Sequence, residues 1–98
     1  MTAGDVYENL ENPQMLFVDV RESDEWANGH VPGARHIPLR ALPNRLEELD
    51  KSKKLIIYCQ VGARSSMAVE FLMGQGFENI AHMHGGLAAW TYPIDGSP

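Results

Sequence analysis

One stretch decides how this chain folds, Leu55-Ile56-Ile57-Tyr58-Cys59-Gln60-Val61-Gly62-Ala63-Arg64-Ser65-Ser66. An apolar run, 55–58, stops at Cys59, which is the only cysteine in the sequence. A loop with one glycine and one arginine follows, and residues 66–75 carry apolar pairs four residues apart, which indicates a largely buried helix. We therefore predict a strand, a short loop and a helix N-terminus. Loop N–H groups and the positive end of a helix dipole then converge beside the thiol.

Such surroundings lower the pKa of a cysteine and hold an anion next to its sulfur. A lone cysteine without context is more often a buried structural residue. The position of Cys59 at a strand end, shortly before Gly62 and Arg64, favours the reactive interpretation. The working hypothesis is a nucleophilic Cys59 that acts on a small anionic substrate.

The other loop residues have predicted supporting roles. Gly62 lets the loop turn with its amides inward. Arg64 faces either the anionic end of the substrate or neighbouring carboxylates that fix the loop, and the sequence leaves both open. Ser65 is the predicted N-cap of the following helix, with a contact to the substrate as a secondary role. Three side chains line or rim the pocket and form a weakly charged surface suited to a small anion: Gln60, Val61 and Ala63.

Strands and helices alternate along the rest of the chain. Met15–Val20 is a nearly continuous apolar run, typical of a strand buried on both faces. A brief helix is expected after it, with Ser23 as N-cap. Leucines between 39 and 49 recur at helical spacing, but Pro43 interrupts them, so a regular helix is predicted to begin near Asn44. This order favours an α/β fold with a mainly parallel sheet, in which sites lie at the carboxyl ends of the strands.

Composition limits the possible functions of the chain. Its 98 residues, 1–98, suit one domain, and no apolar run is long enough to span a bilayer. The first residues lack the features of a signal peptide. A net charge of −5 without a basic cluster argues against nucleic acid as a partner. One cysteine allows no internal disulfide and no resolving thiol. We expect a cytoplasmic monomer that contacts neither membrane nor nucleic acid.

Three segments together resemble the rhodanese family over nearly the whole chain. They are Asp19-Val20-Arg21 with Glu25 and Gly29-His30-Val31-Pro32-Gly33-Ala34, then the Cys59–Ser65 loop, then Gly85-Gly86 with Trp90. The resemblance implies a single rhodanese-like domain with four or five mainly parallel strands flanked by helices on both faces. It also implies a sulfurtransferase without a cofactor. Its cysteine takes a sulfane sulfur from thiosulfate or a similar donor and passes it, as a persulfide, to cyanide or another thiophilic acceptor.

The sequence departs from this family at both ends. Family members often begin with a short strand before the first helix, and here the chain starts almost at that helix. The usual glycine-proline extension after the tryptophan helix is also missing, so one sheet edge is expected to be shorter or covered differently. Asp19 and Arg21, at the end of the first predicted strand, are interpreted mainly as a charged brace for the active loop and only secondarily as catalytic.

Two alternatives stay open at this point, and a metal site is not expected. A persulfide carrier or interaction module would deliver sulfur to a partner protein. A phosphatase or arsenate reductase would use a similar loop, but phosphatases resembling this fold place five residues between cysteine and arginine, whereas four separate Cys59 from Arg64. A metal site would need more than His82 and His84, since a third ligand at a recognisable spacing is missing, and no metal is expected.

Overall fold

The computed structural model describes residues 1–96, in which four strands form one parallel sheet. The strands are β1 (Met15–Asp19), β2 (Arg35–His36), β3 (Lys54–Tyr58) and β4 (Ile80–His82), in the order β2-β1-β3-β4. β1 and β3 occupy the centre, and their register pairs Asp19 with Tyr58 at the carboxyl ends. The predicted α/β fold with a parallel sheet is therefore confirmed.

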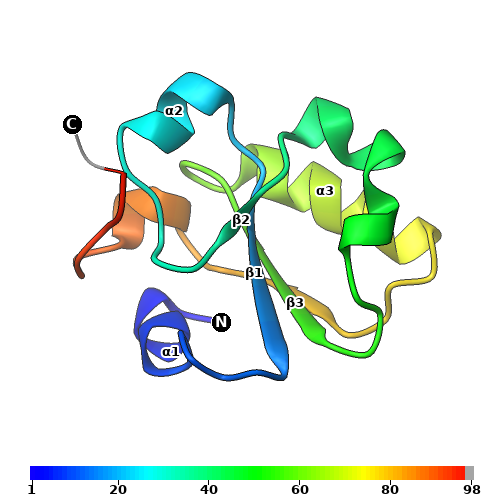
Figure 1. Cartoon of the computed structure of the whole chain (residues 1–98), viewed down its shortest axis with the longest axis horizontal. Coiled ribbons are helices and arrows are strands. Elements are labelled where there is room, and N and C mark those ends of the chain that lie inside the picture. The colour runs from blue at the N-terminus through cyan, green and yellow to red at the C-terminus, as the bar shows by residue number, and fades with distance from the viewer. Residues whose placement is uncertain (97–98) are drawn as a thin grey trace.

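Helices cover both faces of this sheet (Figure 1). Helix α1 (Ala3–Glu8) packs on one face, and helix α3 (Ala63–Gly74) packs on the other together with the 3-10 segments η1 (Leu39–Asn44) and η2 (Leu46–Glu48). Helix α2 (Ser23–Ala27) follows the end of β1, and a last 3-10 turn, η3 (Gly86–Ala89), follows β4. Both of these elements therefore come directly after a strand's carboxyl end, where the site was predicted.

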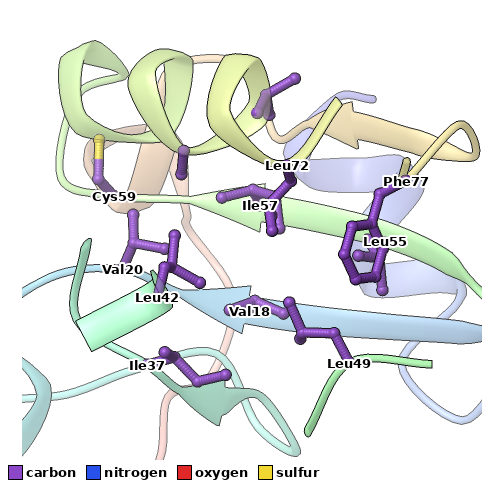
Figure 2. Close-up of a cluster of buried hydrophobic side chains, with 12 residues drawn as sticks. Val18, Val20, Ile37, Leu42, Leu49, Leu55, Ile57, Cys59, Leu72 and Phe77 are labelled. Atoms are coloured by element: carbon purple, nitrogen blue, oxygen red, sulfur yellow. The ribbon is translucent and has the colours of Figure 1, made fainter. Parts of the chain in front are cut away.

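Alternation along β1 and β3 divides the core into two clusters. Phe17, Ile56 and Tyr58 point to the α1 face. Val18, Ile57 and the residues that share their direction point to the α3 face. Figure 2 shows this second cluster, in which Cys59 continues the row formed by Leu55 and Ile57: Val18, Val20, Ile37, Leu42, Leu49, Leu55, Ile57, Cys59, Leu72 and Phe77 are labelled there.

The edge of the sheet at β4 is covered by the first residue. The backbone nitrogen of Met1 donates to the carbonyl of His82 over 2.8 Å, and the His84 amide donates to the carbonyl of Met1 over 2.8 Å. The tail pairs with the connector before β2, because His30 and Asp95 exchange backbone hydrogen bonds of 2.9 and 3.0 Å. The proline and glycine content of residues 91–98 predicts an irregular tail, of which residues 97–98 lie outside the described residues.

Three local predictions were wrong. Helix α2 is capped by Glu22, which forms a capping box with Glu25, so Ser23 is its first helical residue. The leucine repeat forms 3-10 turns instead of a regular helix beginning near Asn44. Pro43 supplies no N–H, and the segment closes through tight bonds such as Arg45 N–H to Leu42 O, 3.1 Å.

The third correction concerns helix α3. It begins at Ala63 after an N-cap at Gly62, whose φ of 127° is open to glycine and strained for other residues. Ser65 is therefore inside the first turn and does not cap it. The helix is also less buried than predicted, because Met67 and Met73 are exposed.

Candidate active site

Cys59 lies directly after the carboxyl end of β3, and its side chain points between the sheet and α3. Its sulfur is directed at the first turn of that helix (Figure 2). The residue is only 1% exposed and belongs to the apolar cluster on that face. The thiol therefore lies at the boundary between the core and the loop that follows.

Two backbone amides donate directly to this sulfur. The distances to Cys59 Sγ are 3.1 Å from the Gly62 nitrogen and 3.3 Å from the Ser65 nitrogen. Burial by itself raises the pKa of the Cys59 thiol, but hydrogen bonds from the backbone N–H groups of Ser65 and Gly62 lower it and outweigh burial. The net result is a lowered pKa, because these donors stabilise the negative sulfur. The arrangement favours a thiolate, the reactive form of cysteine.

The 3-10 turn η3 holds the backbone of the cysteine loop through hydrogen bonds. The Leu87 amide donates to the carbonyl of Cys59 over 2.9 Å, and the Ala88 amide donates to the carbonyl of Gln60 over 3.0 Å. This approach requires Gly86, where a Cβ atom would lie 2.5 Å from the Cys59 oxygen. Gly85 and Gly86 belong to a predicted family motif, but no role in the site was predicted for them. A pair of adjacent glycines was the available signal for a close backbone approach.

Gly86→Ala is expected to displace the Cys59 backbone and to slow any reaction of its sulfur by about tenfold or more, since small displacements of reacting atoms are costly. Gly33→Ala is the matched control. Both glycines have positive φ, 62° and 78°, but a Cβ at Gly33 meets nothing within 4 Å. Thiol alkylation rates and urea unfolding of both variants measure the difference. Equal rates for the two variants would contradict the role given to the close approach.

Asp19 and Arg21 form a buried ion pair on the side of the sheet opposite the sulfur. Their side chains are 0% and 3% exposed, and Arg21 Nη2 lies 2.8 Å from Asp19 Oδ2. The same nitrogen donates to the carbonyl of Gly29 over 2.7 Å, and Nη1 donates to Gln60 Oε1 over 3.3 Å. The pair thus joins the end of β1 to the connector before β2 and to the residue after Cys59. This geometry supports the predicted bracing role.

Arg64 is paired with a carboxylate. Its two terminal nitrogens donate to the two oxygens of Glu25 in helix α2, over 2.5 and 2.8 Å. Hydrogen bonding from Arg64 lowers the pKa of Glu25 to about 2 despite its partial burial. Of the two alternatives for Arg64, the structure shows the one that fixes the loop. Glu25 was not among the predicted site residues, because nothing local in the sequence joins it to a residue 39 positions later.

The remaining predicted rim residues differ in their surroundings. Val61 is 67% exposed and Ala63 is also exposed, so both face solvent at the loop. Gln60 is half-buried and its side-chain oxygen accepts from Arg21. The loop therefore has a held inner side and an open outer side formed by Val61 and Ala63.

The described residues offer neither a metal site nor a membrane-spanning helix. Within 1–96, histidine, cysteine, aspartate and glutamate side chains form no group of three or more that could hold a metal ion. The longest helix there, α3, has 12 residues, and no helix in that part of the chain has the length and apolar character of a membrane span.

The structure thus places a cysteine loop between the carboxyl end of a parallel strand and the N-terminus of a helix, with two backbone amides donating to the sulfur. A family model for the rhodanese-like domain matches residues 2–92, and this chain belongs to that family. It is 38% identical to a sulfurtransferase of Allochromatium vinosum over 83% of this chain and 76% of that protein. It is 35% identical to the thiosulfate sulfurtransferase GlpE of Stutzerimonas stutzeri over 88% of this chain and 81% of that protein.

Solved structures agree with the sequence matches. A crystal structure of a rhodanese-related protein from Thermoplasma volcanium superposes with a TM-score of 0.87 at 34% identity, covering 98% of this chain and 96% of that one. The rhodanese-like fold predicted from the three segments is thereby confirmed, and the chain is a single rhodanese-like domain.

Proposed function

We propose that this protein is a sulfurtransferase that carries a sulfane sulfur on Cys59. The observation that carries the proposal is the pair of amide hydrogen bonds from Gly62 and Ser65 to the Cys59 sulfur. These donors favour the thiolate before the reaction, and loop amides can stabilise the negative sulfur of a persulfide after it. The two named sulfurtransferase relatives support the same class of reaction.

Thiosulfate or a similar small anion is the proposed donor. The Cys59 thiolate attacks the outer sulfur, a new sulfur–sulfur bond forms, and the bond within thiosulfate breaks so that sulfite leaves with the electron pair. Cyanide or another thiophilic acceptor then attacks the outer sulfur of the persulfide, which forms thiocyanate in the case of cyanide and returns the thiolate. No external oxidant or reductant is required by this balance. The donor assignment is supported by the name of the Stutzerimonas stutzeri relative.

The loop length favours this reaction over phosphoryl transfer. Four residues separate Cys59 from Arg64, one fewer than in phosphatases that resemble this fold. The Gly62 and Ser65 amides donate to the Cys59 sulfur itself, and the Arg64 guanidinium is paired with Glu25. A tetrahedral phosphate would have to draw its donors from these same groups. Aryl phosphatase activity that is lost in Cys59→Ser would speak for the alternative.

Incubation of the reduced protein with thiosulfate tests the proposal. The expected result in intact-mass spectrometry is one added sulfur, which cyanide removes. Because the chain has a single cysteine, the added sulfur can be assigned to Cys59. An unmodified mass, in a sample whose thiol is shown to be free, would overturn the proposal.

A persulfide carrier that serves a partner protein is the second candidate, and the exposed Val61 favours it. This apolar side chain is 67% exposed two residues from Cys59, where a protein acceptor could contact it. The chain also has no second cysteine to receive the sulfur, so the acceptor is external in either case. Transfer to a protein thiol much faster than transfer to cyanide would favour the carrier. A reducing compartment such as the cytoplasm, which keeps a lone thiol reduced, suits both candidates.

A further inference from the structure

His82, the last residue of β4, lies beside the cysteine loop although no sequence motif connects them. Its Nδ1 is 3.4 Å from the hydroxyl oxygen of Ser65. Ser65 is fully buried, its amide donates to Cys59 Sγ over 3.3 Å, and its hydroxyl donates to the carbonyl of Gly62 over 3.0 Å. Ser65 thus contacts the Cys59 sulfur, the carbonyl of Gly62 and the imidazole of His82.

The bonding at Ser65 determines which imidazole nitrogen carries a proton. A hydroxyl has one proton, and that of Ser65 is donated to Gly62. The serine oxygen can therefore only accept from His82, which requires a proton on Nδ1. Burial is the largest cause that lowers the pKa of His82, and electrostatic contributions from the nearby His84 side chain and the amino group of Met1 lower it further. A lowered pKa favours the neutral ring, and the bonding at Ser65 places its single proton on Nδ1.

An open cavity of about 230 Å³ lies next to these groups, between the first turn of α3 and the end of β4. Ser66, His82 and His84 are among the residues that line it. The cavity gives solvent access to the His82 ring. His84 shares this cavity with His82 but is exposed and has no side-chain hydrogen bond to the loop in the described residues, so it serves as a natural control.

We propose that His82 is a positioning residue of the sulfur site, which donates from Nδ1 to Ser65 Oγ and so holds Ser65 where it stabilises negative charge on Cys59. The inference rests on the proposed function for its purpose, but the effect on the thiol exists without any sulfur donor. A ring with the proton on the other nitrogen would compete for the serine hydroxyl, and a side chain without a donor would leave Ser65 free to turn away. In both cases the Cys59 thiolate loses support.

The pKa of the Cys59 thiol measures this support directly. It is obtained by pH titration of thiolate absorbance in the ultraviolet, with Cys59→Ser subtracted so that only this thiol is counted. His82→Phe keeps a ring but removes the donor, and is expected to raise the pKa by about half a unit. His82→Asn keeps an N–H close to the place of Nδ1 and is expected to restore most of the difference. His84→Leu removes no hydrogen bond to Ser65, so it is expected to change the Cys59 pKa much less than His82→Phe does.

A second cycle tests whether His82 acts through Ser65. In a Ser65→Ala background, which removes the hydroxyl but keeps the amide, His82→Phe is expected to add no further shift. Urea unfolding confirms that each variant is folded, and His82→Leu replaces His82→Phe if the larger ring prevents folding. The inference is overturned by equal shifts for His82→Phe and His82→Asn, by a shift in His84→Leu as large as that in His82→Phe, by no shift at all, or by full additivity with Ser65→Ala.

The same titration separates the two proposals. If the thiol pKa values follow the expected pattern and thiosulfate adds no sulfur, sulfur transfer is wrong while the role of His82 at the thiolate stands. If thiosulfate adds one sulfur and the variants titrate like the wild type, the role of His82 is wrong while the proposed function stands.

Discussion

Cys59→Ser is expected to abolish sulfur transfer and to leave the fold intact. A serine oxygen cannot form a persulfide. A serine hydroxyl is also hardly ionised at neutral pH, whereas the Gly62 and Ser65 amides favour ionisation of the Cys59 thiol. The substitution is nearly the same size, and the new oxygen can still accept from both amides, so the free energy of unfolding should change by less than about 2 kcal/mol. Thiocyanate formation and urea unfolding measure the two effects.

Met73→Ser provides the matched control for this variant. It places the same residue type on the exposed far part of α3, and it should keep both thiocyanate formation and the sulfur adduct. Thiocyanate formed by Cys59→Ser above the rate without protein would contradict the assignment of Cys59 as the sulfur carrier.

Asp19→Asn is expected to lower the free energy of unfolding by about 3–5 kcal/mol, which makes it the largest expected effect on stability. Both members of the Asp19 and Arg21 pair are almost completely buried. Removing the carboxylate charge leaves a guanidinium in the interior without its counter-charge. Urea unfolding of the variant measures the loss.

Two further variants show whether burial causes this cost. Arg40→Gln removes the pair between Arg40 and Glu22, whose arginine side chain is 73% exposed, and should leave stability nearly unchanged. Asp19→Asn combined with Arg21→Met removes both buried charges and should be less destabilising than Asp19→Asn alone. If Asp19→Asn lowers the free energy of unfolding no more than Arg40→Gln does, burial of the Asp19–Arg21 pair does not make its loss destabilising.

The sequence was sufficient for the features that one segment contains. The mainly apolar run from Leu55 to Tyr58 is typical of a strand covered on both faces, and the two core clusters show that coverage. The residue types from Cys59 to Arg64 predicted a loop leading into a helix, and the structure has that order. Local chemistry and the hydrophobic pattern agreed here, so the centre of the fold could be predicted.

Asp19 and Arg21 were predicted to brace the loop, but two other sets of contacts come from distant parts of the chain and were not predicted. Glu25 neutralises Arg64, and amides of η3 bind the carbonyls of Cys59 and Gln60. Such pairs depend on where strand ends meet, which spacing along one segment does not show. The helix start was also misplaced. Serine is a common N-cap residue, so Ser65 was predicted to cap the helix, but Gly62 occupies the cap position with a positive φ and the helix begins at Ala63.

The position of the sulfur within a core cluster has a consequence for changing this protein. Cys59 packs with Val20, Leu42 and their neighbours, so a substitution that loosens this cluster also shifts the reactive atom relative to its donors. Substitutions within this buried cluster therefore change conformational stability and the reactivity of Cys59 together. Val61 and Ala63, which face solvent, carry no such coupling. Acceptor preference can diversify at these two positions while the buried half of the site stays constant.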